Sequence, residues 1–110
     1  MVLLDPDVVL RSDAAAVIAA IERASSGAPP LRPEVTGTRE VAEIFTGRAL
    51  GAQLAHIDGL PGLIFVLDGR LFSAIEFVVE NGHIIEISIV AQKETIASLA
   101  VEAETEAPGI

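Results

Sequence analysis

Two glutamates and one histidine are the residues of this 110-residue chain best suited to acid–base chemistry. Glu76 and Glu86 each stand inside an apolar run, and His56 lies near the end of a predicted strand. A carboxyl or imidazole group in an apolar setting can serve as a general acid or base. Each of these three residues could also have a purely structural role. Either glutamate could lie at a sheet edge, or at a dimer contact paired with Arg48 or Arg70, and a histidine near a turn is often only partly exposed.

Two hairpin turns predict the geometry around the glutamates. Asn81-Gly82 and Asp68-Gly69 each stand between apolar runs. Both pairs favour two-residue turns, because the central residues of a type I′ turn need positive φ. The turns predict three consecutive strands, with Leu67 opposite Arg70 and Glu80 opposite His83.

Strict alternation from these pairs predicts that Glu76 and Glu86 lie on opposite faces of the sheet, so that at most one of them reaches a pocket. One face is expected to carry Leu63, Phe65, Phe72, Ala74, Glu76, Val78, Ile85, Ile87 and Ile89. The other is expected to carry Ile64, Val66, Leu71, Ser73, Ile75, Phe77, Val79, Ile84, Glu86, Ser88 and Val90. Both faces are largely apolar and should be covered, one by two short helices and the other by a second copy in a two-fold homodimer.

The remaining elements follow from caps, periodicity and turn residues. We expect a short strand over residues 8–11 and a helix over 14–24, capped by Asp13, with an apolar stripe of Val17, Ile18 and Ile21. An exposed connector should lead to a second helix, capped by Thr38 and ending near residue 47. A strand around 50–57, a turn at 59–62 and a short helix over 94–99 complete the prediction.

Composition narrows the classes of function. Sixteen acidic residues against seven basic ones give a net charge of −9, which disfavours direct binding to nucleic acid. There is no cysteine, and the apolar runs are shorter than a membrane span needs. We therefore expect a cytoplasmic protein that has no membrane contact.

Several common sites are not predicted. His56 and His83 are far apart and lack a carboxylate cluster at ligand spacing, so no metal and no other cofactor is expected. His83 follows a turn and should be a solvated partner of Glu80. The segment 59–62 does not open a helix and so is no phosphate loop. The absence of tyrosine removes a common oxyanion donor.

Several segments in fixed order carry a resemblance to a known family. They are Leu3-Leu4-Asp5-Pro6-Asp7-Val8-Val9-Leu10-Arg11-Ser12-Asp13-Ala14-Ala15-Ala16, Gly27-Ala28-Pro29, Glu34-Val35-Thr36-Gly37, Val41-Ala42, Phe45-Thr46-Gly47-Arg48-Ala49, Ile57-Asp58-Gly59-Leu60-Pro61-Gly62 and Phe77-Val78-Val79-Glu80-Asn81-Gly82-His83-Ile84. The chain resembles the SnoaL-like group of the nuclear transport factor 2 superfamily. More narrowly, it resembles the SnoaL-like domain at the C-terminal end of actinobacterial extracytoplasmic-function sigma factors.

The resemblance implies an α+β fold in which a curved antiparallel sheet forms a cone with helices on one face. A helix usually precedes the Asp-Pro-Asp segment in this family, and only Met1 to Leu4 precede it here, so residues 1–101 are expected to be an excised or shortened single domain. Residues 102–110 are expected to form an acidic flexible tail. After the last strand, Gln92-Lys93-Glu94-Thr95-Ile96 departs from the family pattern in a region implied to help regulate the polymerase-binding core.

A cone of this type has a pocket, for which Arg11, Phe77 and Ser88 are candidate lining residues. The leading hypothesis is a noncatalytic domain that dimerises or docks on a sigma-factor core or RNA polymerase and senses a small apolar ligand. The alternative is a small isomerase, cyclase or hydrolase that uses Glu76, Glu86 or His56 on an apolar substrate.

Overall fold

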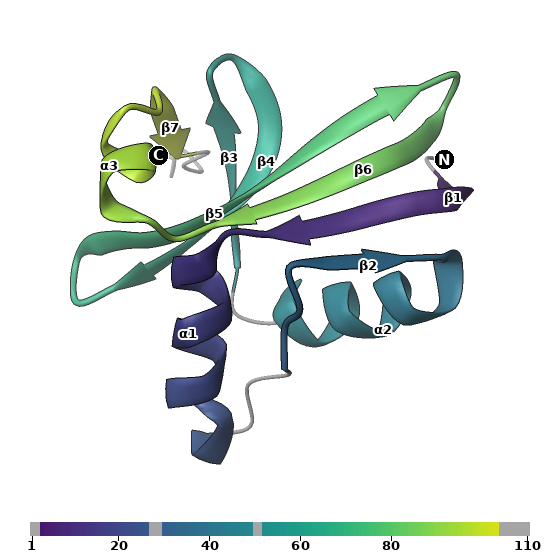
Figure 1. Ribbon diagram of the computed structural model, residues 1–110. Helices are drawn as coiled ribbons and strands as arrows, with labels where there is room; N and C mark the ends of the chain where they lie inside the picture. The colour runs from purple at the N-terminus through teal and green to yellow at the C-terminus, as the bar shows by residue number, and fades with distance from the viewer. Residues whose placement is uncertain (1–2, 27–29, 50–51, 104–110) are drawn as a thin grey trace.

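One curved sheet contains every strand in the described part of the chain (Figure 1). The computed structural model describes residues 3–26, 30–49 and 52–103. The strands are β1 (Leu3–Ser12), β2 (Glu34–Thr36), β3 (Gln53–Ile57), β4 (Leu60–Leu67), β5 (Arg70–Glu80), β6 (His83–Val90) and β7 (Val101–Ala103). The helices are α1 (Ala14–Glu22), α2 (Thr38–Ala49) and α3 (Lys93–Ala97), with a 3-10 turn at Ala24–Ser26.

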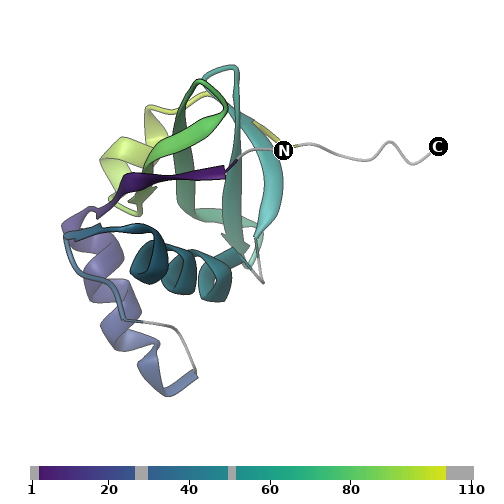
Figure 2. The ribbon, with the colours of Figure 1, turned by 90° about the vertical axis from the view of Figure 1, so that its right-hand side faces the viewer.

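The strand order is β2-β1-β6-β5-β4-β3-β7. Strands β1 and β6 run parallel, and the other neighbouring pairs are antiparallel. The sheet bends around α2 (Figure 2), while α1 and α2 lie on one side of it (Figure 1). The predicted α+β fold with a curved, cone-like sheet is confirmed.

Three Asx-Gly turns connect the central strands. Asp68-Gly69 and Asn81-Gly82 have the positive φ angles that a type I′ turn needs, which confirms both predicted hairpins. Asp58-Gly59 has the same signature and joins β3 to β4, with Ile57 opposite Leu60. The predicted turn over residues 59–62 was therefore misplaced, because residues 60–62 already belong to β4.

Two β-bulges change which side chains share a face. Between β5 and β6 the pairing passes from Val79 opposite Ile84 to Val78 opposite Glu86, so Ile85 is the extra residue. Between β4 and β5 a similar shift leaves Phe72 as the extra residue. Each bulge also breaks the predicted alternation within its own strand, because Ile84 and Glu86 of β6, and Leu71 and Ser73 of β5, lie on opposite faces. The face assignment predicted across the strands was therefore wrong.

The larger core lies between the sheet and the two longer helices. Its buried members are Val8, Leu10, Ala16, Ala20, Leu31, Val35, Val41, Ile75, Ile87 and Ile89. Helix α2 contributes Val41 fully, and Ile44 and Phe45 partly, as predicted. Helix α1 instead buries Ala16 and Ala20, while Ile18 and Ile21 are 54% and 69% exposed. Of the stripe predicted for α1, Val17 does pack against this core. The prediction was wrong for Ile18 and Ile21, because the small side chains of Ala16 and Ala20 let the helix approach the sheet on their side.

A smaller core lies against the other side of the sheet, near its C-terminal end. Ala55, Ile57, Ile64 and Ala74 are buried there, with Leu99 and Val101 packed against them. Glu102 and Ala103, which the sequence analysis assigned to the tail, belong to β7 and pair with β3. The rest of that predicted tail, residues 104–110, lies outside the described residues.

Candidate functional site

A row of polar residues crosses the sheet face opposite α1 and α2. Glu34, Arg11, Ser88 and Glu76 are successive cross-strand partners on β2, β1, β6 and β5. The Arg11 guanidinium contacts Glu34 Oε1 at 3.0 Å and Glu86 Oε2 at 3.3 Å. The Ser88 hydroxyl donates to the same Glu86 oxygen at 3.4 Å. One arginine therefore holds two carboxylates in place along the row.

Glu76 and Glu86 lie on the same face, which corrects the prediction that they lie on opposite faces. Glu76 pairs with Ser88, and Val78 pairs with Glu86, because the bulge at Ile85 has shifted β6 by one residue. Glu86 is bound to Arg11 rather than to Arg70, and the side chain of Arg48 lies outside the described part of the chain. Among the residues described, half-buried Glu76 has no ion pair.

Glu76 lines a hollow at the point where β4 and β5 separate. Figure 1 shows the β3–β4 hairpin and the β5–β6 hairpin diverging, and the last β4–β5 pair before this point is Gly62 opposite Glu76. A hollow of about 210 Å³ is lined by Ile57, Leu60, Pro61, Glu76, Phe77, Val78 and Ser88. A second, apolar hollow of about 560 Å³ shares four of these residues and adds Val79 and Ile84. We call this region the strand fork.

Gly62 keeps the strands close at the base of the fork. A Cβ at this position would lie 2.7 Å from Ile57 Cδ1 and 2.8 Å from the Ile75 carbonyl oxygen. The side chains just beyond are correspondingly exposed: Leu60 is 63% and Val78 45% exposed. Sequence reasoning missed Leu60 and Pro61 because it placed them in a turn. The Asp58-Gly59 pair was the signal that could have put them in a strand.

Phe77 and His56 lie apart from the polar row. The Phe77 ring packs edge-on against Phe45 of α2, with centroids 5.7 Å apart, although the residue also lines both hollows of the strand fork. His56 lies on β3 between Pro61 of β4 and Glu102 of β7. The structure thus brings together Arg11, Glu76, Glu86 and Ser88, and leaves His56 outside the group.

Asp13 joins two parts of the fold that the sequence analysis treated separately. Its Oδ1 accepts from the Ala16 amide at 2.8 Å, which confirms the predicted N-cap of α1. Its Oδ2 also accepts from the amides of Ala91 and Gln92, at 2.9 and 3.0 Å. Next to it, the hydroxyl of Ser12 is buried and has no hydrogen-bond partner among the described residues. The contacts of Asp13 are thus structural, and no role in chemistry is needed to explain them.

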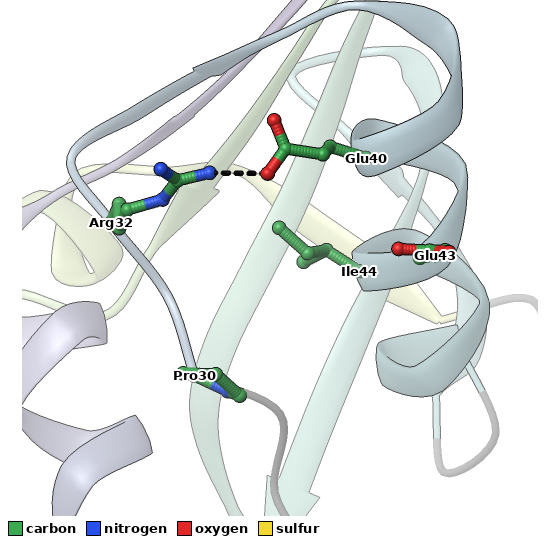
Figure 3. A pocket seen from close by; sticks show the side chains of 5 residues that line it. All are labelled: Pro30, Arg32, Glu40, Glu43 and Ile44. Atoms are coloured by element: carbon green, nitrogen blue, oxygen red, sulfur yellow. Dashed lines mark hydrogen bonds and ion pairs between the residues drawn. The ribbon is translucent and has the colours of Figure 1, made fainter.

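Another hollow, of about 420 Å³, lies between α2 and the connector that precedes β2 (Figure 3). Arg32 and Glu40 point toward one another across it, 2.7 Å apart, and Ile44 lies between the helix and the connector. Both charged side chains are more than half exposed, so the ion pair is worth little. The arginine is already paired, which leaves little charge to attract a ligand.

Neither a metal centre nor a membrane span is found in the described parts. The residues described contain no group of three His, Cys, Asp or Glu side chains that could hold a metal ion. Within the same residues, no helix is long and apolar enough to cross a membrane. What the polar row can do is hold a cation or a hydrogen-bond donor beside an apolar surface.

Comparison with known proteins gives one structural relative. No protein-family model matches the chain, and no curated protein matches it. The chain is similar to the crystal structure of the Mycobacterium tuberculosis extracytoplasmic function sigma factor SigJ, with a TM-score of 0.58 and 21% sequence identity. The fold is therefore one found within a sigma factor. The match covers 86% of this chain but only 36% of that one, so this chain spans about a third of its relative.

Proposed function

We propose that the chain is a SnoaL-like regulatory domain that acts by protein contact, in the manner of the C-terminal domain of an extracytoplasmic-function sigma factor. The observation that carries this proposal is the fold shared with part of SigJ. The order of the sequence segments that resemble the same family supports it independently. The partner is a sigma-factor core or RNA polymerase in the cytoplasm, and a small ligand modulates the contact.

The strand fork is the contact surface that suits this role best. It presents exposed Leu60 and Val78 beside the carboxylate of Glu76, on a face that also carries Glu34 and Glu86. Arg11 is the one cation of the polar row described above, so the face is acidic. Such a surface favours a partner that presents apolar and basic side chains.

The homodimer expected from the sequence is part of the same proposal. A two-fold dimer through this sheet face would bring the carboxylates of both copies together. It would therefore need each Arg11 to contact carboxylates of the other copy. Sedimentation equilibrium of the purified chain separates a dimer from a monomer that binds a different partner.

The test of the function is a two-hybrid assay of the chain against the sigma-factor cores of the organism that encodes it. A sigma-factor core that binds the chain in this assay is then used for transcription in vitro from its own promoter, with and without the purified chain. We expect at least one core to bind and its transcript yield to change. If no core binds and no yield changes, the proposed function is wrong.

One observation favours an enzyme as the second candidate. Glu76 and Glu86 share a face with Ser88 and Arg11, so two carboxylates could act on one substrate. Glu86 is held by Arg11 and Ser88, whereas Glu76 is free of ion pairs in the described residues and lies beside an apolar hollow. Glu76 would be the general base or acid, and Arg11 and Ser88 would hold the substrate.

This alternative is tested by screening the chain for turnover of apolar ketones, epoxides and esters. Glu76→Gln, Glu86→Gln and His56→Ala are then assayed one at a time against any activity found. The enzyme hypothesis expects Glu76→Gln to reduce kcat by about 100-fold or more. It is eliminated if all three variants keep full turnover.

A further inference from the structure

Two cations of this acidic protein line a hollow that the site above does not include. The hollow holds about 420 Å³ between the β4–β5 hairpin and α3. It is lined by Leu67, Arg70, Leu71, Phe72, Ala91, Lys93, Ile96 and Ala97. We call it the basic hollow.

Two of the seven basic residues in the sequence line the basic hollow, and a third contacts one of its lining residues. Arg70 and Lys93 line the basic hollow, and the Arg23 guanidinium lies over the Phe72 ring, 5.5 Å from its centroid. None of the three has an ion pair within the described residues, whereas Arg11 and Arg32 are paired with glutamates. No carboxylate lines the basic hollow in the described part of the chain.

The walls of the basic hollow are apolar. Leu67, Leu71 and Ile96 come from β4, β5 and α3, and the bulge at Phe72 adds an aromatic ring. Its volume falls within the roughly 300–1,000 Å³ that small-molecule sites occupy. Apolar walls with cations among the lining residues match a molecule that has an apolar body and one anionic group.

We propose that the basic hollow binds a small organic anion with an apolar tail, such as a medium-chain carboxylate. The carboxylate contacts Arg70 and Lys93, and the tail packs on Leu67, Leu71 and Ile96. The neutral counterpart of such a ligand gains only the apolar contact, and a cationic counterpart is repelled. This inference deepens the ligand-sensing part of the proposed function, because the same ligand bridges α3 and the hairpin.

The probe is sodium decanoate, titrated into the full chain below its critical micelle concentration and followed by calorimetry. Decanol and decylammonium are the matched neutral and cationic probes. We expect saturable binding of decanoate, with both other probes at least about tenfold weaker. Amide NMR shifts should locate the ligand at Leu71 and Ile96. Absent or equal binding of the three probes, or shifts confined to the larger core, overturns the proposal.

Variants test the two parts of the basic hollow. The double variant Arg70→Gln and Lys93→Gln should weaken decanoate binding about tenfold or more and leave the affinity for decanol unchanged. Arg39→Gln, which removes another exposed arginine on α2, is the matched control and should change neither. Unchanged decanoate binding in the double variant contradicts the proposal. A chain that fails here but still alters sigma-dependent transcription without decanoate keeps the proposed function and loses only the basic hollow.

Discussion

Asp13 is the side chain on which the junction of helix and sheet depends most. Its carboxylate accepts from the amide of Ala16 in α1 and from the amides of Ala91 and Gln92 after β6. A carboxylate that accepts several backbone N–H groups makes charge-assisted bonds, which are stronger than neutral ones. One residue thus fixes the start of α1 to the end of the central hairpin.

Asp13→Ala should lower the free energy of unfolding by about 2–4 kcal/mol, because a helix cap and two further amide contacts are lost together. Asp13→Asn keeps the cap and should lose less. Chemical denaturation measures both, with Glu22→Ala at the exposed end of α1 as the control. A loss for Asp13→Ala no larger than that of the control would contradict this account of the junction.

Ser12 presents the opposite case, a buried polar group without a partner among the described residues. Burying a hydroxyl without a hydrogen bond is unfavourable, so Ser12→Ala should keep or raise the free energy of unfolding, by up to about 1 kcal/mol. Thermal unfolding checks the direction. A loss of more than about 1 kcal/mol would mean that the hydroxyl has a partner after all.

At the scale of elements, the sequence correctly predicted the turns and the helix cap, because local chemistry controls these features. The Asp68-Gly69 and Asn81-Gly82 turns followed from positive φ, and the cap of α1 followed from Asp13. The bulges did not follow, because one extra residue such as Ile85 needs no glycine and leaves no turn signal. The adjacent apolar pair Ile84-Ile85 was the available hint, since it interrupts the alternation of β6.

The prediction of the candidate site was partly wrong for the same reason, because the bulge at Ile85 was not predicted. Four of its predicted residues do meet, but only because the bulge brings Glu86 and Ser88 onto the face of Glu76. The orientation of α1 also could not be predicted, since Ala, Val and Ile occur on every side of that helix. The side of α1 that packs against the sheet is the side on which the two elements can approach most closely.

Deleting residues beside the bulge tests it directly. Removing Ile85 deletes the extra residue and keeps Val78 opposite Glu86, so this variant should still fold and unfold cooperatively. Removing Ser88 instead turns Ile89 out of the larger core, or Ile87 if the bulge is lost, and should abolish folding. Circular dichroism and chemical denaturation distinguish the two. Equal loss of structure in both variants would contradict the bulge.

At the scale of the whole molecule, charge separates two surfaces. The chain carries a net charge of −9. The strand fork is also acidic, because Glu76 lines it and the polar row lies beside it. The basic hollow carries the opposite sign through Arg70 and Lys93. Binding of a basic partner at the strand fork should therefore weaken as salt rises, because exposed charges are screened.

The most direct test of regulation by protein contact is the dissociation constant between the purified chain and the sigma-factor core that scores in the two-hybrid assay. Leu60→Lys places a cation in the strand fork, and Leu54→Lys is its matched control on β3, since the two leucines are 63% and 64% exposed. We predict that Leu60→Lys weakens binding about tenfold or more, while Leu54→Lys binds like the unchanged chain. Equal affinity of all three proteins, or no binding at all, would contradict the account.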